Sequence, residues 1–472
     1  MKKKILYAGL LITFVSVFNL SCKKEKELEP EKIAATENYN TEELNGHLKQ
    51  TKTFSSDVVT RWLNMQLDML RVPLPPGTGS QAAARAQAYC GIATYESVVP
   101  GMPAYQTLTG QLTAFPTMPT TEPGKAYHWA ASANAALAVM NRSLFPTTAV
   151  INKTNMDKIE DSLEAIYAGE VDNETLQRSI AFGREVAERV FAWAQTDGTI
   201  NPANPPYVPL PAFIGPAFWV QSLGAGNLLM TTPPNNPQAA NPYASQWRLI
   251  VPGVANGTAL APPPAYDIIP GTPFYEMVKD VYDKSQALTP AQIAMAIYHR
   301  DAPGYPGGGH FTAVLSQVLT QSQVKLDVAA LAYAKTGIAA FDATAICFVN
   351  KYNYNLVRPI NYIRNVLHHA TWSAQFNTPG HPEFPSAHAV NGAAVAAMLT
   401  DVIGGNFQFT LNTYGYLGLP ARSYNSFYEM GKEMADSRVF GGIHYQASCD
   451  KGRWLGEKVV ANILNTVKFL KE

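Results

Sequence analysis

The sequence of 472 residues has no excess of charge of either sign, because 36 lysines and arginines balance 36 aspartates and glutamates. A strong basic excess is typical of nucleic-acid-binding proteins, so we expect no nucleic-acid partner. Charged residues are also few, at 15% of the chain, whereas hydrophobic residues make up 47%. This composition excludes a mostly disordered chain and is sufficient for a large buried core.

Cysteine is scarce, with four residues in the whole chain. The spacings of Cys22, Cys90, Cys347 and Cys449 match no zinc-binding pattern. The three cysteines after Cys22 allow at most one disulfide, and the sequence leaves open whether Cys347 and Cys449 form it.

One long hydrophobic run stands out, at the N-terminus. Three lysines precede an apolar stretch of about 16 residues, which is typical of an export signal and short for a membrane-spanning helix. Cys22 at its end resembles the acylated cysteine of bacterial lipoproteins, although Asn19 departs from that pattern. We therefore expect a lipoprotein signal peptide over 1–22, anchored through Cys22, and a polar, disordered tether over 23–52. An ordinary cleaved signal with an incidental cysteine is the alternative.

This reading predicts an exported protein, held at the bacterial outer membrane on its periplasmic or its cell-surface side. We expect no further membrane-spanning segment. Whether the chain forms a homo-oligomer is left open.

Alternating apolar and polar residues, the mark of a half-buried strand, are also scarce. The periodicity over 54–197 and 276–470 is helical, with frequent alanine, which favours close helix packing. Prolines recur between 198 and 275, so we expect a long ordered loop there. The sequence predicts an all-α domain over 53–472, with two helical bundles, long proline-rich loops and the active site in the C-terminal bundle.

Three segments of the last quarter carry chemically active residues. Lys351 and Arg358 are seven residues apart, which on one helix would place both on the same face. Two neighbouring cations repel each other unless an anion lies between them. Each segment alone also fits a structural role, such as solvated surface charges.

The second segment places Ser386, Ala387 and His388 at the start of a predicted helix, where free backbone N–H groups favour anions. In the third, Gly441 and Gly442 separate Arg438 from His444 and can turn both side chains toward one point. Together the three segments predict a pocket for a tetrahedral oxyanion, held by cations and served by two histidines.

The three motifs, read as Lys-x6-Arg-Pro, Pro-Ser-Ala-His and Ser-Arg-x5-His, resemble the signature of a known superfamily. It contains the type 2 phosphatidic acid phosphatases and the vanadium-dependent haloperoxidases. The likeness covers about residues 80–472 and is closer to the soluble haloperoxidases, whose fold is helical.

The resemblance implies a vanadate cofactor, for which phosphate could substitute. His444 would be the axial metal ligand. The cofactor-binding set would be Lys351, Arg358, Ser386, Ala387, Arg438 and His444. His388 would exchange protons with the bound peroxide, and Lys351 would polarise it. The implied partners are hydrogen peroxide, halide and a small organic acceptor.

Three departures from the family pattern affect the expectations. Ala387 replaces the commoner glycine, which should cost little because only its backbone N–H is used. Ser448 stands where an aspartate often orients the axial histidine, so the orienting group could be Ser448, Asp450 or a backbone carbonyl. His381 resembles bromoperoxidase-like members, and with Phe348 it favours bromide or iodide over chloride. His310 and Asp301 are further candidates for the mouth of the pocket.

Two alternatives to a haloperoxidase remain open. The same residues would serve an acid phosphatase that hydrolyses phosphomonoesters through a phosphohistidine at His444. A non-catalytic oxyanion- or glycan-binding lipoprotein would need the cations but not the proton exchange of His388.

Overall fold

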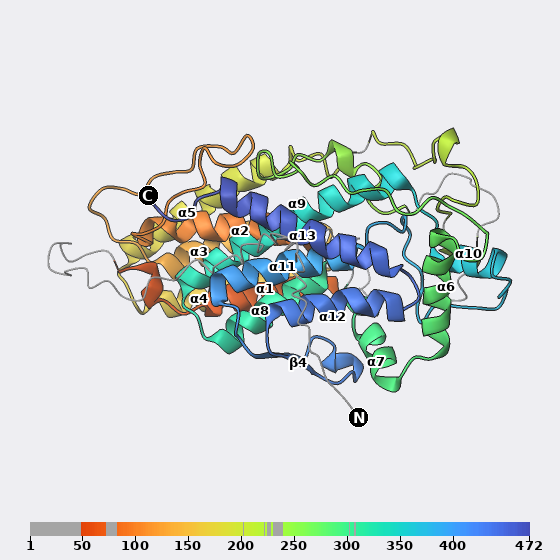
Figure 1. Ribbon diagram of the computed structural model, residues 1–472. Coiled ribbons are helices and arrows are strands. Elements are labelled where there is room, and N and C mark those ends of the chain that lie inside the picture. The colour runs from red at the N-terminus through yellow and green to blue at the C-terminus, as the bar shows by residue number, and fades with distance from the viewer. Residues whose placement is uncertain are drawn as a thin grey trace, which may run out of the picture.

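The computed structural model describes residues 49–71, 83–201, 203–220, 222–223, 228–229, 239–301, 303–305 and 308–472. The predicted signal peptide, Cys22 and most of the predicted tether lie outside the described residues. The structure is helical, as the sequence predicts, and Figure 1 shows an elongated bundle with α6, α7 and α10 at one end.

The α-helices are α1 (Asp57–Leu70), α2 (Ala83–Val98), α3 (Trp129–Leu144), α4 (Val150–Ala168), α5 (Asn173–Ala194), α6 (Pro273–Gln286), α7 (Pro290–Tyr298), α8 (Gly309–Ser322), α9 (Leu326–Tyr354), α10 (Pro359–Asn365), α11 (Ala387–Ile403), α12 (Phe427–Phe440) and α13 (Gln446–Thr466). Short 3₁₀ helices cover Thr51–Thr53, Val99–Gly101, Pro211–Phe213, Ala244–Gln246 and Gly415–Leu417. Two antiparallel strand pairs complete the elements: β1 (Ser222–Leu223) with β2 (Leu228–Leu229), and β3 (Phe409–Leu411) with β4 (Arg422–Tyr424).

Small residues bring α2 and α9 into close contact and so join the N-terminal helices to the C-terminal ones. A Cβ atom added at Gly91 would lie 2.4 Å from the Tyr333 carbonyl oxygen, and one at Gly337 would lie 2.5 Å from that of Gln87. Side chains at these two glycines would therefore push the helices apart. Most buried hydrophobic residues of both halves form one continuous core, and a small separate cluster comprises Ala389, Ala435, Val439 and Cys449.

Helix α9 is long and apolar enough to cross a membrane by length and composition, which the sequence analysis did not anticipate. However, 94% of its most apolar window is buried inside the protein. Apolar residues all around a helix are also expected when neighbouring helices cover every face. We therefore describe α9 as the central core helix of the bundle.

The proline-rich segment between α5 and α6 packs against α9. The buried Asp342 carboxylate on α9 accepts hydrogen bonds from the backbone N–H groups of Ile250 (2.7 Å) and Val251 (3.0 Å). Burial raises the pKa of this carboxyl to about 7. The Tyr352 hydroxyl donates to the Ala240 carbonyl at 2.6 Å. These bonds fix the loop beside the C-terminal end of α9.

Cys90, Cys347 and Cys449 are free thiols, and all three are buried. The disulfide between Cys347 and Cys449 that the sequence left open is therefore not formed in this structure. The Cys347 thiol lies 3.9 Å from the Pro385 carbonyl oxygen, close to the start of α11.

Candidate oxyanion-binding site

Lys351 and Arg358 do not share a helix, so the expectation of one helical face is wrong. Helix α9 ends at Tyr354, and Asn355 follows in the left-handed conformation with φ 46°. Arg358 is extended (φ −79°, ψ 151°) and caps α10. The physical reason is Pro359, which disfavours helical backbone in the residue before it. The chain turns, and both cations still enter the same region.

Lys351 is fully buried in the last turn of α9. Its Nζ donates to the carbonyl oxygens of Pro382 (2.9 Å) and Glu383 (3.0 Å). Burial lowers the pKa of this ammonium group to about 7. An ammonium has three N–H donors, so one is left for a ligand.

Arg358 lies at the centre of the site and is also fully buried. Its Nη1 donates to the Ile443 carbonyl (2.7 Å) and lies 3.1 Å from His444 Nε2. Its Nε and Nη2 donate to the carbonyl and to Nδ1 of His381, each at 3.0 Å. Burial lowers the pKa of the guanidinium to about 10.

Arg438 enters the site from the last turn of α12 and is 1% exposed. Its Nη1 donates to the His299 carbonyl, and its guanidinium lies 5.0 Å from the centre of the Phe376 ring. Its buried Nε has no partner within the described part of the chain. Burial lowers the pKa of this group as well.

The two glycines after α12 act as the sequence predicts. The helix ends at Phe440, and Gly442 adopts φ +76°, which favours glycine. This turn carries the chain from Arg438 to His444, which is 2% exposed.

The neighbours of His444 define its tautomer. Arg358 Nη1 can only donate a hydrogen bond, so Nε2 of the neutral imidazole must accept it. The proton is therefore on Nδ1, which donates to Glu383 Oε1 at 2.8 Å. Burial, reinforced by the charge of Arg358, holds the pKa of His444 well below its usual range. The nitrogen lone pair consequently faces the cations.

Glu383 is the functional residue that the sequence analysis missed. Asp450, one of the three orienting groups considered, is exposed and accepts from Gln446 at 3.0 Å. The Ser448 hydroxyl makes no hydrogen bond within the described chain. Burial raises the pKa of Glu383 to about 7. The sequence offered one signal for Glu383: it is a lone acidic residue in a proline-rich segment, three positions before Ser386.

The start of α11 supplies the neutral donors. Ser386 is the N-cap residue, and its hydroxyl oxygen accepts from the Ala389 N–H at 3.5 Å. Its hydroxyl hydrogen remains available to donate. Ala387 is the first helical residue, and its N–H has no partner within the helix because first-turn N–H groups have none.

His388 and Asp301 form an ion-pair geometry on the more exposed side of the site. His388 Nε2 lies 2.9 Å from Asp301 Oδ1, and their side chains are 17% and 25% exposed. Burial, together with the charge of Arg438, lowers the pKa of His388, and Asp301 opposes this shift. His388 can thus exchange protons with solvent, which the fully buried His444 cannot do as readily.

The three residues proposed for the halide region lie in different surroundings. His381 is half-buried, bonded to Arg358, and in edge contact with the Phe348 ring at 5.2 Å. His310 is 2% exposed and stacks on Tyr414 at 5.4 Å. Helix α8 carries His310 into the core, and a role of His310 at the mouth of the pocket stays a prediction.

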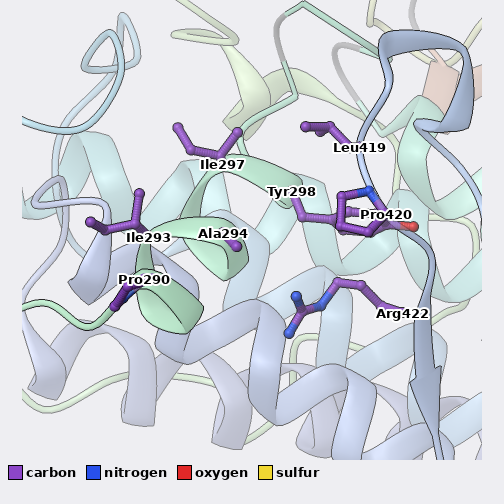
Figure 2. A pocket seen from close by; sticks show the side chains of 8 residues that line it. All are labelled: Pro290, Ile293, Ala294, Ile297, Tyr298, Leu419, Pro420 and Arg422. Carbon is purple, nitrogen blue, oxygen red and sulfur yellow. The ribbon is translucent and has the colours of Figure 1, made fainter.

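Two cavities occur in the described structure outside this cluster. Figure 2 shows the first, of about 320 Å³, whose lining is mostly apolar side chains of α7 and the segment 419–422. Its charged residue, Arg422, is bound to Glu433. The second, of about 740 Å³, is lined by Val357 and Asn361 on either side of Arg358, among others. Within the described chain, neither lining includes a predicted cofactor-binding residue.

The chemistry of the cluster fits a tetrahedral or trigonal-bipyramidal oxyanion. Lys351, Arg358 and Arg438 are buried, and among the described residues none forms an ion pair with a carboxylate. Lys351 and Arg438 keep unused N–H donors, and two further donors come from the start of α11. Guanidinium and ammonium groups of this kind bind oxyanions through charge-assisted hydrogen bonds.

Comparison with known proteins agrees with this geometry. The family model of the VCPO second helical-bundle domain matches residues 331–472, which hold all three motifs. A crystal structure of a bacterial vanadium-dependent iodoperoxidase superposes with a TM-score of 0.73 at 26% identity, over 89% of this chain and 98% of that chain. No curated protein matches the sequence.

Two structures of a bacterial vanadium-dependent chloroperoxidase share the fold. The holo form gives a TM-score of 0.64 at 15% identity, covering 88% of this chain and 98% of that chain. The apo form gives 0.64 at 14%, covering 89% and 98%. The matched domain over residues 331–472 and these likenesses support the assignment of the chain to the superfamily that contains the vanadium-dependent haloperoxidases.

Proposed function

We propose that the protein is a vanadate-dependent haloperoxidase, which oxidises halide with hydrogen peroxide to hypohalous acid. The observation that carries the proposal is that three buried cations, none ion-paired with a carboxylate among the described residues, add to the burial that lowers the pKa of His444, and that one of them, Arg358, donates to His444 Nε2 at 3.1 Å. The iodoperoxidase that covers 89% of the chain at 26% identity supports this function.

The residues divide into those that hold the anion and those that move protons. Lys351, Arg358 and Arg438 would bind its oxygens, with the Ser386 hydroxyl and the Ala387 N–H. His444 Nε2 would be the single protein ligand of the metal. Bound vanadate would supply a Lewis acid that activates hydrogen peroxide toward halide, and the vanadium would keep its oxidation state while the peroxide is reduced.

His388 is the proposed acid–base group. Its lowered pKa keeps the imidazole neutral near pH 7, so it can take a proton from an incoming peroxide. Asp301 accepts the hydrogen bond of His388 Nε2 and steadies the ring. His388 would then return the proton as products leave.

Bromide or iodide is the proposed halide, and a small organic molecule the acceptor of the hypohalous acid. The support is the contact of His381 with Arg358, which places an imidazole beside the anion-binding cations. A phenyl ring at that position would offer no acceptor to Arg358 Nη2.

A paired assay tests the proposal against the phosphatase alternative. The purified protein is freed of bound anion and divided. One half receives vanadate, peroxide and either bromide or iodide, and the other receives a phosphomonoester without vanadate. We expect rapid halogenation and little ester hydrolysis. Brisk hydrolysis with no halogenation at saturating vanadate would reverse the assignment.

His388→Ala separates catalysis from binding. General acid–base catalysis contributes about 10²–10⁴-fold, so we expect halide oxidation to fall by that factor with little change in vanadate affinity. A non-catalytic binding protein would show no turnover in either form.

We also propose that the protein is exported and anchored at the outer membrane through acylated Cys22. The support is the order of basic residues, apolar run and cysteine in the sequence. Labelling of cells with a radioactive fatty acid should mark the wild-type protein and leave Cys22→Ser unmarked. Equal labelling of both would refute the anchor.

A further inference from the structure

The carboxylate that orients His444 comes from an unusual place in this chain. Glu383 lies in the loop before α11, whereas Ser448 occupies the position after His444 where the family pattern often has an aspartate. Glu383 is fully buried, and its Oε1 accepts from His444 Nδ1 (2.8 Å) and from the Tyr445 N–H (2.9 Å). One carboxylate oxygen thus holds both the ring and the backbone beside it.

The backbone of Glu383 is fixed by hydrogen bonds at both its N–H and its carbonyl group. The Glu383 N–H donates to the Leu356 carbonyl at 3.0 Å, and the Glu383 carbonyl accepts from Lys351 Nζ at 3.0 Å. The segment that carries it therefore also contacts one of the three cations. A shift of this segment would move the lysine and the histidine together.

We propose that Glu383 is the positioning residue of His444, replacing the carboxylate that position 448 lacks. By accepting the Nδ1 proton, it fixes the tautomer in which the Nε2 lone pair faces the anion and increases the basicity of that nitrogen. This inference deepens the proposed function and rests on it. Glu383 would not touch the anion and acts through the imidazole.

Binding measurements on the anion-free protein test the proposal without turnover. Loss of such an outer partner typically weakens metal-site affinity about 10–100-fold. We expect Glu383→Leu to raise the dissociation constant for vanadate by that factor in calorimetry. Glu383→Gln preserves an oxygen acceptor at Oε1 and should lose less, which keeps the test open if the leucine variant folds poorly. Asp450→Asn, on the exposed alternative, should bind like the wild type.

Two further readouts separate positioning from general structural support. In ¹⁵N-histidine NMR, wild-type His444 should show the Nδ1–H tautomer, and Glu383→Leu should lose it. Adding Ser448→Asp to Glu383→Ala restores a carboxylate near the ring and should recover most of the affinity. Unchanged affinity and tautomer in Glu383→Leu, or failure of Ser448→Asp to rescue Glu383→Ala, would overturn the proposal.

These results are independent of the assay of halide oxidation. If the wild type binds vanadate but does not oxidise halide, the proposed function fails while the role of Glu383 is still judged by affinity. If halide oxidation is rapid and Glu383→Leu binds vanadate normally, only the role of Glu383 fails.

Discussion

Among the described residues, two buried cations of the scaffold are paired with carboxylates, whereas the three buried cations of the site are not. Arg85 on α2 forms an ion pair with Asp197 at 2.7 Å, and Lys335 in the first half of α9 forms one with Asp401 at the same distance. Four turns further along α9, Lys351 is equally buried but contacts carbonyl oxygens instead.

The difference shows that the protein leaves buried cations without a carboxylate partner at the site, although this is destabilising. A buried charge without a partner of opposite sign is destabilising, and the protein lowers the pKa values of Lys351 and Arg358 accordingly. A bound oxyanion would remove this cost. The unpaired cations therefore identify the anion site more clearly than either cavity does.

The largest expected effect is on anion affinity. Arg358→Met should weaken vanadate binding by about 10–150-fold, because a hydrogen bond to a charged group contributes about 1.5–3 kcal/mol. Arg85→Met, the matched change in the scaffold, should leave the affinity unchanged. Calorimetric titration of the anion-free proteins measures both. Equal vanadate affinity in Arg358→Met and the wild type would contradict the claim that the unpaired cations of the site bind the anion.

Stability should respond in the opposite order. Arg85→Met leaves Asp197 buried without its partner and should lower the free energy of unfolding by about 3–5 kcal/mol. Arg358→Met removes an uncompensated charge, which offsets the cost of leaving the acceptors at Ile443 and His444 unsatisfied, so the anion-free variant should lose less stability than Arg85→Met. Urea unfolding without phosphate or vanadate measures both. A larger loss in Arg358→Met than in Arg85→Met would contradict the comparison.

The free energy of unfolding should depend on pH because the pKa of Lys351 differs between the folded and unfolded states. Its folded pKa of about 7 lies below the unfolded value, so its stabilising contribution is complete above the unfolded pKa and is lost as the pH falls toward 7. The slope should approach about 1.4 kcal/mol per pH unit between pH 7 and 10. Lys351→Met should remove this component from anion-free unfolding curves. The same slope in both proteins would show that the lysine is charged in the folded state.

The smallest expected effect concerns halide preference. His381→Phe removes the acceptor of one Arg358 hydrogen bond, which contributes about 1 kcal/mol, or roughly a fivefold change in a rate ratio. We expect kcat/KM for chloride relative to bromide to rise by that factor. An unchanged ratio would exclude His381 from halide selection.

Much of the site could be predicted from the sequence because local patterns encode it. The start of α11 follows from Pro385 and Ser386, and the turn before His444 follows from two glycines. The motif spacings indicated which residues converge, and of these Arg358 Nη1 and His444 Nε2 lie 3.1 Å apart. The helical fold followed from the periodicity.

The missed features are those that depend on contacts between distant segments. The residues around Glu383 do not indicate that its carboxylate contacts His444, which is 61 residues away in the sequence. The same holds for the contact of Asp301 with His388 across 87 residues. The seven-residue spacing of Lys351 and Arg358 wrongly predicted that both lie on one helix. Helix α9 ends before Asn355, and Pro359 begins a new helix. The burial of His310 likewise depends on how α8 packs.

X-ray absorption at the vanadium edge tests the central claim most directly. The anion-free protein is loaded with one equivalent of vanadate, in the wild-type form and as His444→Ala. The account predicts one imidazole nitrogen bonded to vanadium in the wild type and none in the variant. A vanadium atom surrounded only by oxygen in both proteins would contradict it.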